Sequence, residues 1–187
     1  MASPDGDVPT ELEAAPGPRN GLLATYGLIA IIVVVVLVAD QLTKSWAVSR
    51  LSNDLDGIHI VGSLHLRLAF NSGMAFSRGE GKGKIIGAIA LGIVVAMVWF
   101  ARSVHDTLSR VAIGLVIGGA LGNLSDRVFR AGVGGLPKGF LGGRVVDFVY
   151  LGWWPTFNVA DSCVVVGGIL LAIATLRVPT HDDPKSA

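Results

Sequence analysis

Two aspartates, Asp147 and Asp161, are the residues of this sequence whose surroundings most need a chemical explanation. Asp147 lies between two large apolar residues, and Asp161 lies about one turn into an apolar segment that begins near residue 157. A carboxylate inside such a segment costs roughly 2.5–3.5 kcal/mol unless it has a partner or a use. Apart from Arg144, neither aspartate has a lysine or arginine in its own segment, so the two carboxylates are candidate partners for each other.

Such a pair has a defined chemistry. Two carboxylates a few ångströms apart cannot both ionise, so they share a proton and titrate together. The ionised member draws a proton from a water molecule that attacks an amide carbonyl, while the protonated member polarises the carbonyl oxygen and helps to protonate the leaving nitrogen. Since a helix N-terminus stabilises an anion, Asp161 is the predicted base. The pattern favours an aspartic protease.

Other polar clusters surround these two in the sequence, and each has a simpler interpretation. Asp40 and Lys44 are four residues apart, and a helix-surface ion pair is their preferred role. Asp126 and Arg127 can anchor a helix end at the membrane surface, and for Arg127 this role and a ligand contact have equal weight. Asn158 can cap a helix.

Asn71, which precedes Ser72 and Gly73, can form a turn. All of these residues are expected at the same end of the molecule, where one site could gather them.

The sequence gives little support to a metal site, to nucleic-acid binding or to a disulfide. The four histidines, His59, His65, His105 and His181, include no pair at the spacing of helix-borne ligands, which argues against a zinc peptidase. The net charge of +1 and the lack of a basic stripe argue against nucleic acid as a partner. The single cysteine, Cys163, rules out an internal disulfide and is expected to be a packing residue.

The composition indicates that the elements holding these residues lie in a membrane. Of the 187 residues, 51% are hydrophobic and 16% are charged, against about 25% charged in soluble proteins. A membrane-spanning helix needs roughly 20 mainly apolar residues. Residues 21–177 are therefore predicted to form one domain with four spans, at about 22–39, 85–100, 111–124 and 157–176. Residues 1–20 and 178–187 are predicted to be disordered tails.

The two long connections have the alternation of β-strands. Leu64–Phe70 and Arg144–Tyr150 each suit a strand with one buried face. With four spans, both connections fall on the same side of the membrane. The predicted fold is therefore an all-α membrane protein of four transmembrane helices with a small extramembrane β-sheet at one end.

The charge distribution gives a conflicting indication of orientation. Ten of the fifteen Lys and Arg residues lie on the side of the long connections. The positive-inside bias alone would place that side in the cytoplasm.

The polar clusters resemble, in order, the motifs of the bacterial lipoprotein signal peptidases. The resemblance covers roughly residues 22–176. It rests on five motifs: Asp40-Gln41-x-x-Lys44, Asn71-x-Gly73-x-Ala75-Phe76, Gly122-Asn123-x-x-Asp126-Arg127, Val146-Asp147-Phe148 and Phe157-Asn158-x-Ala160-Asp161-Ser162. Any one of these motifs is weak evidence, but five in order are highly specific.

That resemblance implies a membrane-embedded aspartic endopeptidase that removes the signal peptide of a prolipoprotein just before a diacylglyceryl-modified cysteine. It implies no cofactor, inhibition by globomycin, a monomer, cytoplasmic termini, and a sheet and active site at the outer face of the inner membrane. The implied roles are catalytic for Asp147 and Asp161 and structural for Asp40, Lys44 and Asp126. The implied substrate-binding or site-organising residues are Asn71, Gly73, Asn123, Arg127, Asn158 and Ala160.

Two other functions remain as alternatives. The polar residues could line an ion or proton pathway in a small transporter, in which case changing Asp147 or Asp161 abolishes transport and no peptide is cleaved. A purely structural membrane protein should tolerate asparagine at both positions, which the cost of burying a carboxylate argues against.

Overall fold

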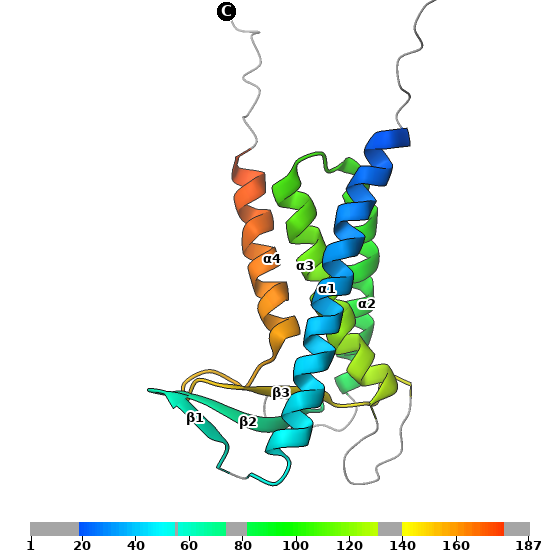
Figure 1. Ribbon diagram of the computed structural model, residues 1–187. Coiled ribbons are helices and arrows are strands. Elements are labelled where there is room, and N and C mark those ends of the chain that lie inside the picture. Colours follow the sequence, from blue (N-terminus) through cyan, green and yellow to red (C-terminus); the bar gives the residue numbers. More distant parts are fainter. Residues whose placement is uncertain (1–18, 55, 74–81, 131–139, 178–187) are drawn as a thin grey trace, which may run out of the picture.

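A computed structural model describes residues 19–54, 56–73, 82–130 and 140–177 (Figure 1). The predicted tails therefore lie outside the described residues, except that the first helix already begins at Arg19. That helix, α1, spans Arg19–Leu51 and is followed by α2 (Lys82–Phe100), the short 3-10 helix η1 (Ala101–Ser103), α3 (Thr107–Phe129) and α4 (Val159–Leu176). All four long helices are apolar and long enough to cross a membrane.

A long apolar helix is present at each of the four predicted spans, and three of these helices are longer than the predicted spans. α1 continues past Ala39 through the Asp40–Lys44 segment, and α3 continues past Leu124 through Arg127. The prediction stopped where polar residues begin, yet a helix continues wherever those polar side chains find partners in the protein. α4 begins two residues later than predicted, because Asn158 is its N-cap and not part of the helix.

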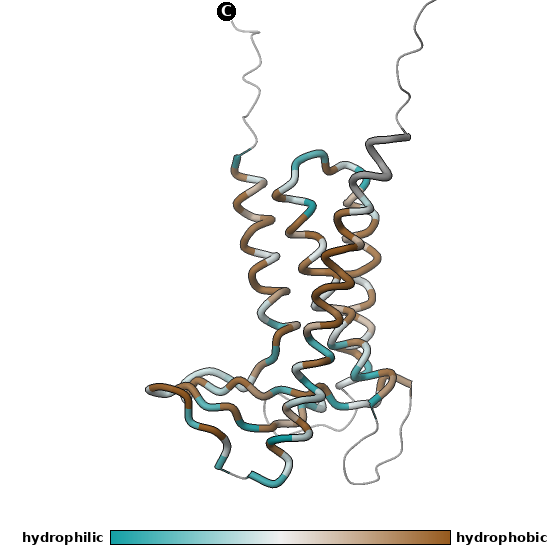
Figure 2. The backbone as a smooth tube through the Cα atoms, in the orientation of Figure 1, coloured by the Kyte–Doolittle hydropathy of each residue, from teal (hydrophilic) through white to brown (hydrophobic). Residues whose placement is uncertain are grey.

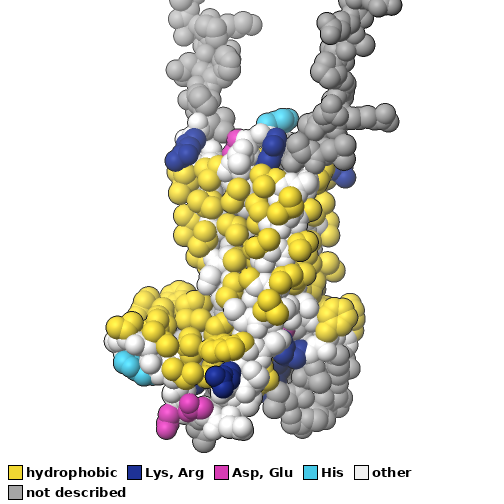
Figure 3. All heavy atoms as spheres, in the orientation of Figure 1, with side chains coloured by type: hydrophobic (Ala, Val, Ile, Leu, Met, Phe, Trp, Pro, Cys, Tyr) yellow, Lys and Arg dark blue, Asp and Glu magenta, His cyan; other side chains and the backbone are white. Residues whose placement is uncertain are grey.

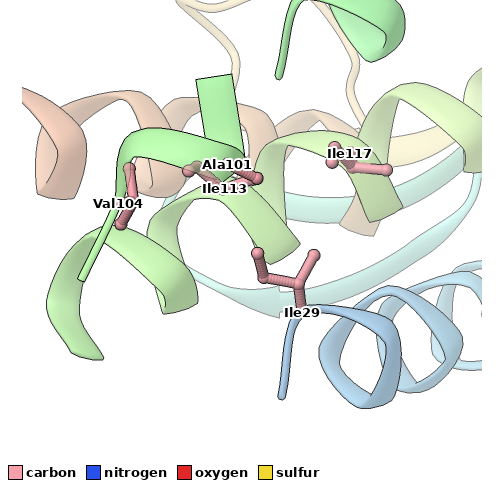
Figure 4. Close-up of a cluster of buried hydrophobic side chains, with 5 residues drawn as sticks. All are labelled: Ile29, Ala101, Val104, Ile113 and Ile117. Carbon is pink, nitrogen blue, oxygen red and sulfur yellow. The ribbon is translucent and has the colours of Figure 1, made fainter. Parts of the chain in front are cut away.

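α3 is the central helix, and it packs against α1, α2 and α4. More than half of its apolar span is buried (56%), whereas the other three helices bury only 11–17% of theirs. Figure 2 shows that hydrophobic residues make up most of the length of the helices in the bundle. Far from the sheet, Ile29, Ala101, Val104, Ile113 and Ile117 join α1, η1 and α3 in one buried cluster (Figure 4).

A small antiparallel sheet lies across one end of the bundle (Figure 1). Its strands are β1 (Ile58–Val61), β2 (Leu64–Asn71) and β3 (Val145–Tyr150), in the order β1-β2-β3. The predicted fold class is confirmed. Both predicted strands are present, and their ends agree with the prediction to within one residue. The strand β1 was not predicted. Its four residues, Ile58–Val61, are all exposed, and three of them are apolar, so they do not alternate regularly between apolar and polar.

Pairing of β2 with β3 places Asp147 opposite Ala69 and Val145 opposite Asn71. Phe157 then forms an isolated bridge with Val149 just before α4 begins. The chain therefore turns back from β3 directly into α4. This return brings the strand that carries Asp147 against the helix that carries Asp161.

Candidate active site

Asp147 and Asp161 line the same cavity, which has a volume of about 700 Å³. The cavity lies between the sheet and the helices α2, α3 and α4. The polar residues of its lining are Asn71, Asn123, Arg127, Asp147, Thr156 and Asp161. Most of the remaining lining residues are apolar, so the carboxylates lie at the polar end of a largely apolar pocket.

Asn158 connects the two aspartates. Its Nδ2 donates to Asp147 Oδ1 at 2.7 Å and to the Val146 carbonyl at 3.2 Å. Its Oδ1 accepts from the Asp161 backbone N–H at 2.9 Å, and its own backbone N–H donates to Asp161 Oδ2 at 3.2 Å. This reciprocal arrangement is a capping box, which begins α4 and fixes the Asp161 side chain in the same step.

Asn123 holds Asp161 from the other side. Its Nδ2 donates to Asp161 Oδ1 at 2.7 Å, while its Oδ1 accepts from Lys44 Nζ at 2.9 Å and from Asn158 Nδ2 at 3.1 Å. Because both donors hold the amide oxygen, the amide nitrogen of Asn123 must face Asp161. The Asp161 carboxyl group thus accepts a hydrogen bond at each of its oxygens.

Asp147 has different surroundings. It is 3% exposed, and burial is the main cause that raises the pKa of its carboxyl to about 7, with the nearby Asp161 charge adding to the effect. Hydrogen bonds from Asn71 and Asn158 oppose this rise in pKa. Asn71 also accepts at Oδ1 from the Gly73 N–H at 2.8 Å, so the predicted turn is present together with the contact to Asp147.

Gly73 needs to be glycine for two reasons. Its φ of +87° is a conformation that other residues rarely adopt, and a Cβ there would come within 3.0 Å of the Gly83 backbone. The end of β2 can therefore pass close to the start of α2, beside the cavity that Gly73 lines.

Arg127 also lines the cavity, and it is 4% exposed. Within the described part of the chain its Nη1 has no hydrogen-bond partner. Its charge interacts with those of Asp126, Asp147 and Asp161. A buried guanidinium nitrogen beside the two carboxylates is suited to bind an oxygen of a ligand.

The three residues expected to give structural support form one buried charged group behind the site. Lys44 Nζ lies 2.7 Å from Asp40 Oδ2 and 3.1 Å from Asp126 Oδ2. The predicted Asp40–Lys44 pair is therefore present, but the expectation of a helix-surface pair was wrong, because both side chains are fully buried. Packing of α1 against α3 encloses the pair, which spacing along one helix cannot show.

Ala160 is fully buried and is not among the residues that line the cavity. Its backbone N–H donates to Asp40 Oδ1 at 3.0 Å, and its carbonyl lies against Gly119 of α3. Ala160 therefore joins the first turn of α4 to the charged group.

Two contributors were given no role from the sequence. Gln41 Nε2 donates to Asp40 Oδ2 at 3.2 Å and to the Gly122 carbonyl at 3.1 Å. Arg130 Nε lies 2.9 Å from Asp126 Oδ1, a pairing that the spacing of four residues could have indicated. The remaining oxygen of Asp126 accepts from the Val146 N–H at 3.1 Å and so fixes the strand next to Asp147.

Comparison with known proteins now identifies the family. A family model described as signal peptidase (SPase) II matches residues 32–177, which include every polar residue of the site. The chain belongs to the signal peptidase II family. The predicted resemblance is thereby confirmed.

Similar members of the signal peptidase II family cover most of the chain. The lipoprotein signal peptidase of Rhodococcus jostii is 43% identical over 150 residues, which are 80% of this chain and 72% of that protein. The lipoprotein signal peptidase of Mycolicibacterium smegmatis is 39% identical over 176 residues, which are 94% of this chain and 70% of that protein.

Two solved structures, both titled as bacterial membrane enzymes studied by the in meso method, have the same fold. The first has a TM-score of 0.67 and 29% sequence identity, and the matched region covers 86% of this chain and 94% of the chain in that structure. The second has a TM-score of 0.67 and 31% sequence identity, and the matched region covers 82% of this chain and 95% of the chain in that structure. The four helices and the sheet are thus the fold of a membrane enzyme.

Proposed function

We propose that this chain is a membrane-embedded aspartic endopeptidase that removes the signal peptide from diacylglyceryl-modified prolipoproteins, cutting just before the lipidated cysteine. Membership of the signal peptidase II family and its lipoprotein signal peptidase relatives support the activity. The observation that carries the mechanism is the pair Asp147 and Asp161 on one cavity, joined through Asn158.

The two carboxyl groups take different roles because their surroundings differ. Asp161, with hydrogen bonds to both oxygens, is the base that takes a proton from the attacking water. Asp147, whose carboxyl has a pKa of about 7, carries the shared proton and donates a hydrogen bond to the scissile carbonyl oxygen. As the C–N bond breaks, the leaving nitrogen takes a proton from the pair, which returns to its starting state.

The cavity is suited to a substrate that stays in the bilayer. Its apolar lining includes Ile86 and Ile93 of α2 and Val164 of α4, which can contact a signal-peptide segment or acyl chains. Asn71, Gly73, Asn123 and Arg127 lie at its polar end. Arg127 Nη1, which has no hydrogen-bond partner among the described residues, is proposed to bind a carbonyl oxygen of the substrate. Globomycin is proposed to occupy the same cavity.

The enzyme is proposed to act as a monomer in the bacterial inner membrane. Both termini would lie in the cytoplasm, and the sheet and dyad near the outer face. This orientation follows the family over the positive-inside count. Several of the basic residues on the sheet side have local partners, as Lys44 and Arg130 do with Asp126, and this weakens the count as a topology signal.

The geometry disfavours the transporter alternative. The described charged side chains of the site gather at the sheet end of the bundle, and the middle of α1 and α2 is apolar. A transport pathway needs polar groups across the full thickness of the membrane.

A gel-shift cleavage assay tests the proposal, with a diacylglyceryl-modified prolipoprotein as substrate in detergent or lipid. We expect the wild type to release the signal peptide, and Asp147→Asn and Asp161→Asn to fold but lose at least about 10³-fold in rate, because acid–base catalysis contributes roughly 10²–10⁴-fold for each group. Asp106→Asn is the matched control. Asp106 caps α3 at the other end of the molecule, and asparagine caps equally well.

If the two site variants cut at the normal rate, Asp147 and Asp161 would not be the catalytic pair, although the chain would still be a signal peptidase. Failure of the wild type itself to cut would exclude the peptidase function.

A further inference from the structure

One face of the sheet is apolar and is only partly covered by the rest of the protein. Ile58 pairs with Leu66, and Leu66 pairs with Val149, so the three side chains lie in a row across the sheet on one face. Leu66 and Val149 are packed in a cluster with the end of α1 and with Val159 at the start of α4. Ile58, farther out in the row, is 40% exposed.

The outer part of the opposite face is polar, whereas Phe148, farther in along β3 on that face, is buried in the hydrophobic cluster. His59 pairs with His65, with their rings 4.8 Å apart, and the ring of His65 lies 6.3 Å from that of Tyr150. The guanidinium of Arg67 lies over the Tyr150 ring at 4.3 Å. The sheet is therefore amphipathic, and its apolar face is the one that meets the first turn of α4.

Exposed apolar side chains continue to the outer end of the sheet. Val61 in β1 is 67% exposed, and Trp153 and Trp154, in the loop between β3 and α4, are 75% and 53% exposed. The two indole rings meet edge to face at 5.6 Å. Figure 3 shows hydrophobic side chains over the part of the sheet that projects beside the bundle, close to the hydrophobic surface of the helices, with charged and histidine side chains on the side away from them.

We propose that this projecting surface, formed by Ile58–Val61 with Trp153 and Trp154 and called here the sheet wing, lies in the lipid–water boundary and contacts lipid directly. An exposed apolar patch needs an occupant. Lipid is the occupant that the geometry favours, because the apolar face is continuous with the point where the α4 span begins. Tryptophan is enriched at this boundary, and the polar face would meet water. The proposal rests on the four spans and not on the cleavage activity.

The wing also has a place in the site. The loop that carries the tryptophan pair continues into Pro155 and Thr156, which line the cavity, and then into the helix of Asp161. A wing held at the membrane surface therefore fixes one wall of the cavity at a constant depth. A substrate anchored in the same bilayer would meet the two aspartates at that depth.

Fluorescence quenching at two adjacent positions tests the inference. In a background that replaces all four tryptophans by phenylalanine, a single tryptophan is introduced by Ile58→Trp or, as the matched control, by His59→Trp on the polar face. Each protein is reconstituted into phosphatidylcholine vesicles with or without brominated acyl chains. An interfacial apolar face lies about 5–10 Å into the headgroup and acyl boundary, so bromine should reduce the emission of Ile58→Trp at least about two-fold.

The control should instead be quenched by aqueous acrylamide and only weakly by bromine. Elution as a single species in detergent checks that each variant is folded. Equal quenching of both positions by acrylamide would overturn the proposal, because the wing would then stand in water. Protection of Ile58→Trp from both quenchers would also overturn it, since a second copy or another protein would then cover the face.

Discussion

At the scale of single residues, the asymmetry of the two aspartates governs the chemistry. Asp147 is buried in the sheet and meets two amide side chains, whereas Asp161 lies in a helix cap with a hydrogen bond to each oxygen. Both use Asn158, which is at once the cap of α4 and the bridge of the pair. One asparagine thus couples the start of a helix to the geometry of the site.

The raised pKa of Asp147 predicts how its removal changes stability with pH. Its carboxyl has a pKa of about 7 when folded and 3.8 as the ordinary value, so between these pH values the folded state binds more protons than the unfolded state. Stability contributed by this group is therefore present at low pH and lost as the pH rises toward 7. At about 1.4 kcal/mol per pH unit, the loss reaches on the order of 4 kcal/mol at pH 8.

Asp147→Asn should accordingly raise the melting temperature in detergent at pH 8 and change it little at pH 4. The control, Asp106→Asn, should not be stabilised at pH 8, because a hydrogen bond from the Ser109 N–H lowers the pKa of Asp106. An Asp147→Asn effect that is the same at both pH values would contradict the raised pKa.

At the scale of elements, close helix packing holds the site in place. A Cβ on Gly119 would lie 2.4 Å from the Ala160 carbonyl, and one on Gly122 would lie 2.6 Å from Asp40. α3 can therefore approach both α4 and α1 only because small residues face them. These approaches allow Lys44 of α1 to reach Asn123 of α3, which in turn reaches Asp161 of α4.

Two neighbouring glycines of α4 test this packing. A Cβ on Gly167 would come within 2.8 Å of the Ala112 carbonyl of α3, whereas one on Gly168 would meet no atom within 4 Å. We expect Gly167→Ala to destabilise the protein by about 1–3 kcal/mol, because the helices must separate. Gly168→Ala should be neutral or slightly stabilising, since alanine favours the helix. Thermal unfolding in detergent measures both, and equal effects would disprove the packing argument.

At the scale of the whole molecule, the proposed orientation in the membrane can be tested by labelling the two ends of the bundle. The sheet end is proposed to face outward and the η1 end inward. In a Cys163→Ser background, Ser63→Cys at the sheet end and Ser103→Cys in η1 are both exposed positions. In intact spheroplasts a membrane-impermeant maleimide should label only Ser63→Cys, and after lysis it should label both. The reverse pattern would favour the positive-inside count.

Sequence by itself determined the four spans, two of the three strands and the motif residues. Long apolar runs have to form helices in lipid, where the backbone must satisfy its own hydrogen bonds. Two carboxylates in apolar segments without a cation predicted a shared site, because burying each one alone is costly. The order of the five motifs identified the family.

Tertiary structure alone decided which groups touch. Asn123 and Asn158, which form hydrogen bonds with Asp161, lie 38 and 3 residues before it in the sequence. Lys44 is enclosed by α3, whose Asn123 lies 79 residues after it. Spacing along a helix could suggest the Asp40–Lys44 pair but not that α3 would bury it. Likewise, the apolar face of the sheet could be assigned to the membrane side only once β3 was seen to turn back into α4, because strand alternation defines two faces and not their surroundings.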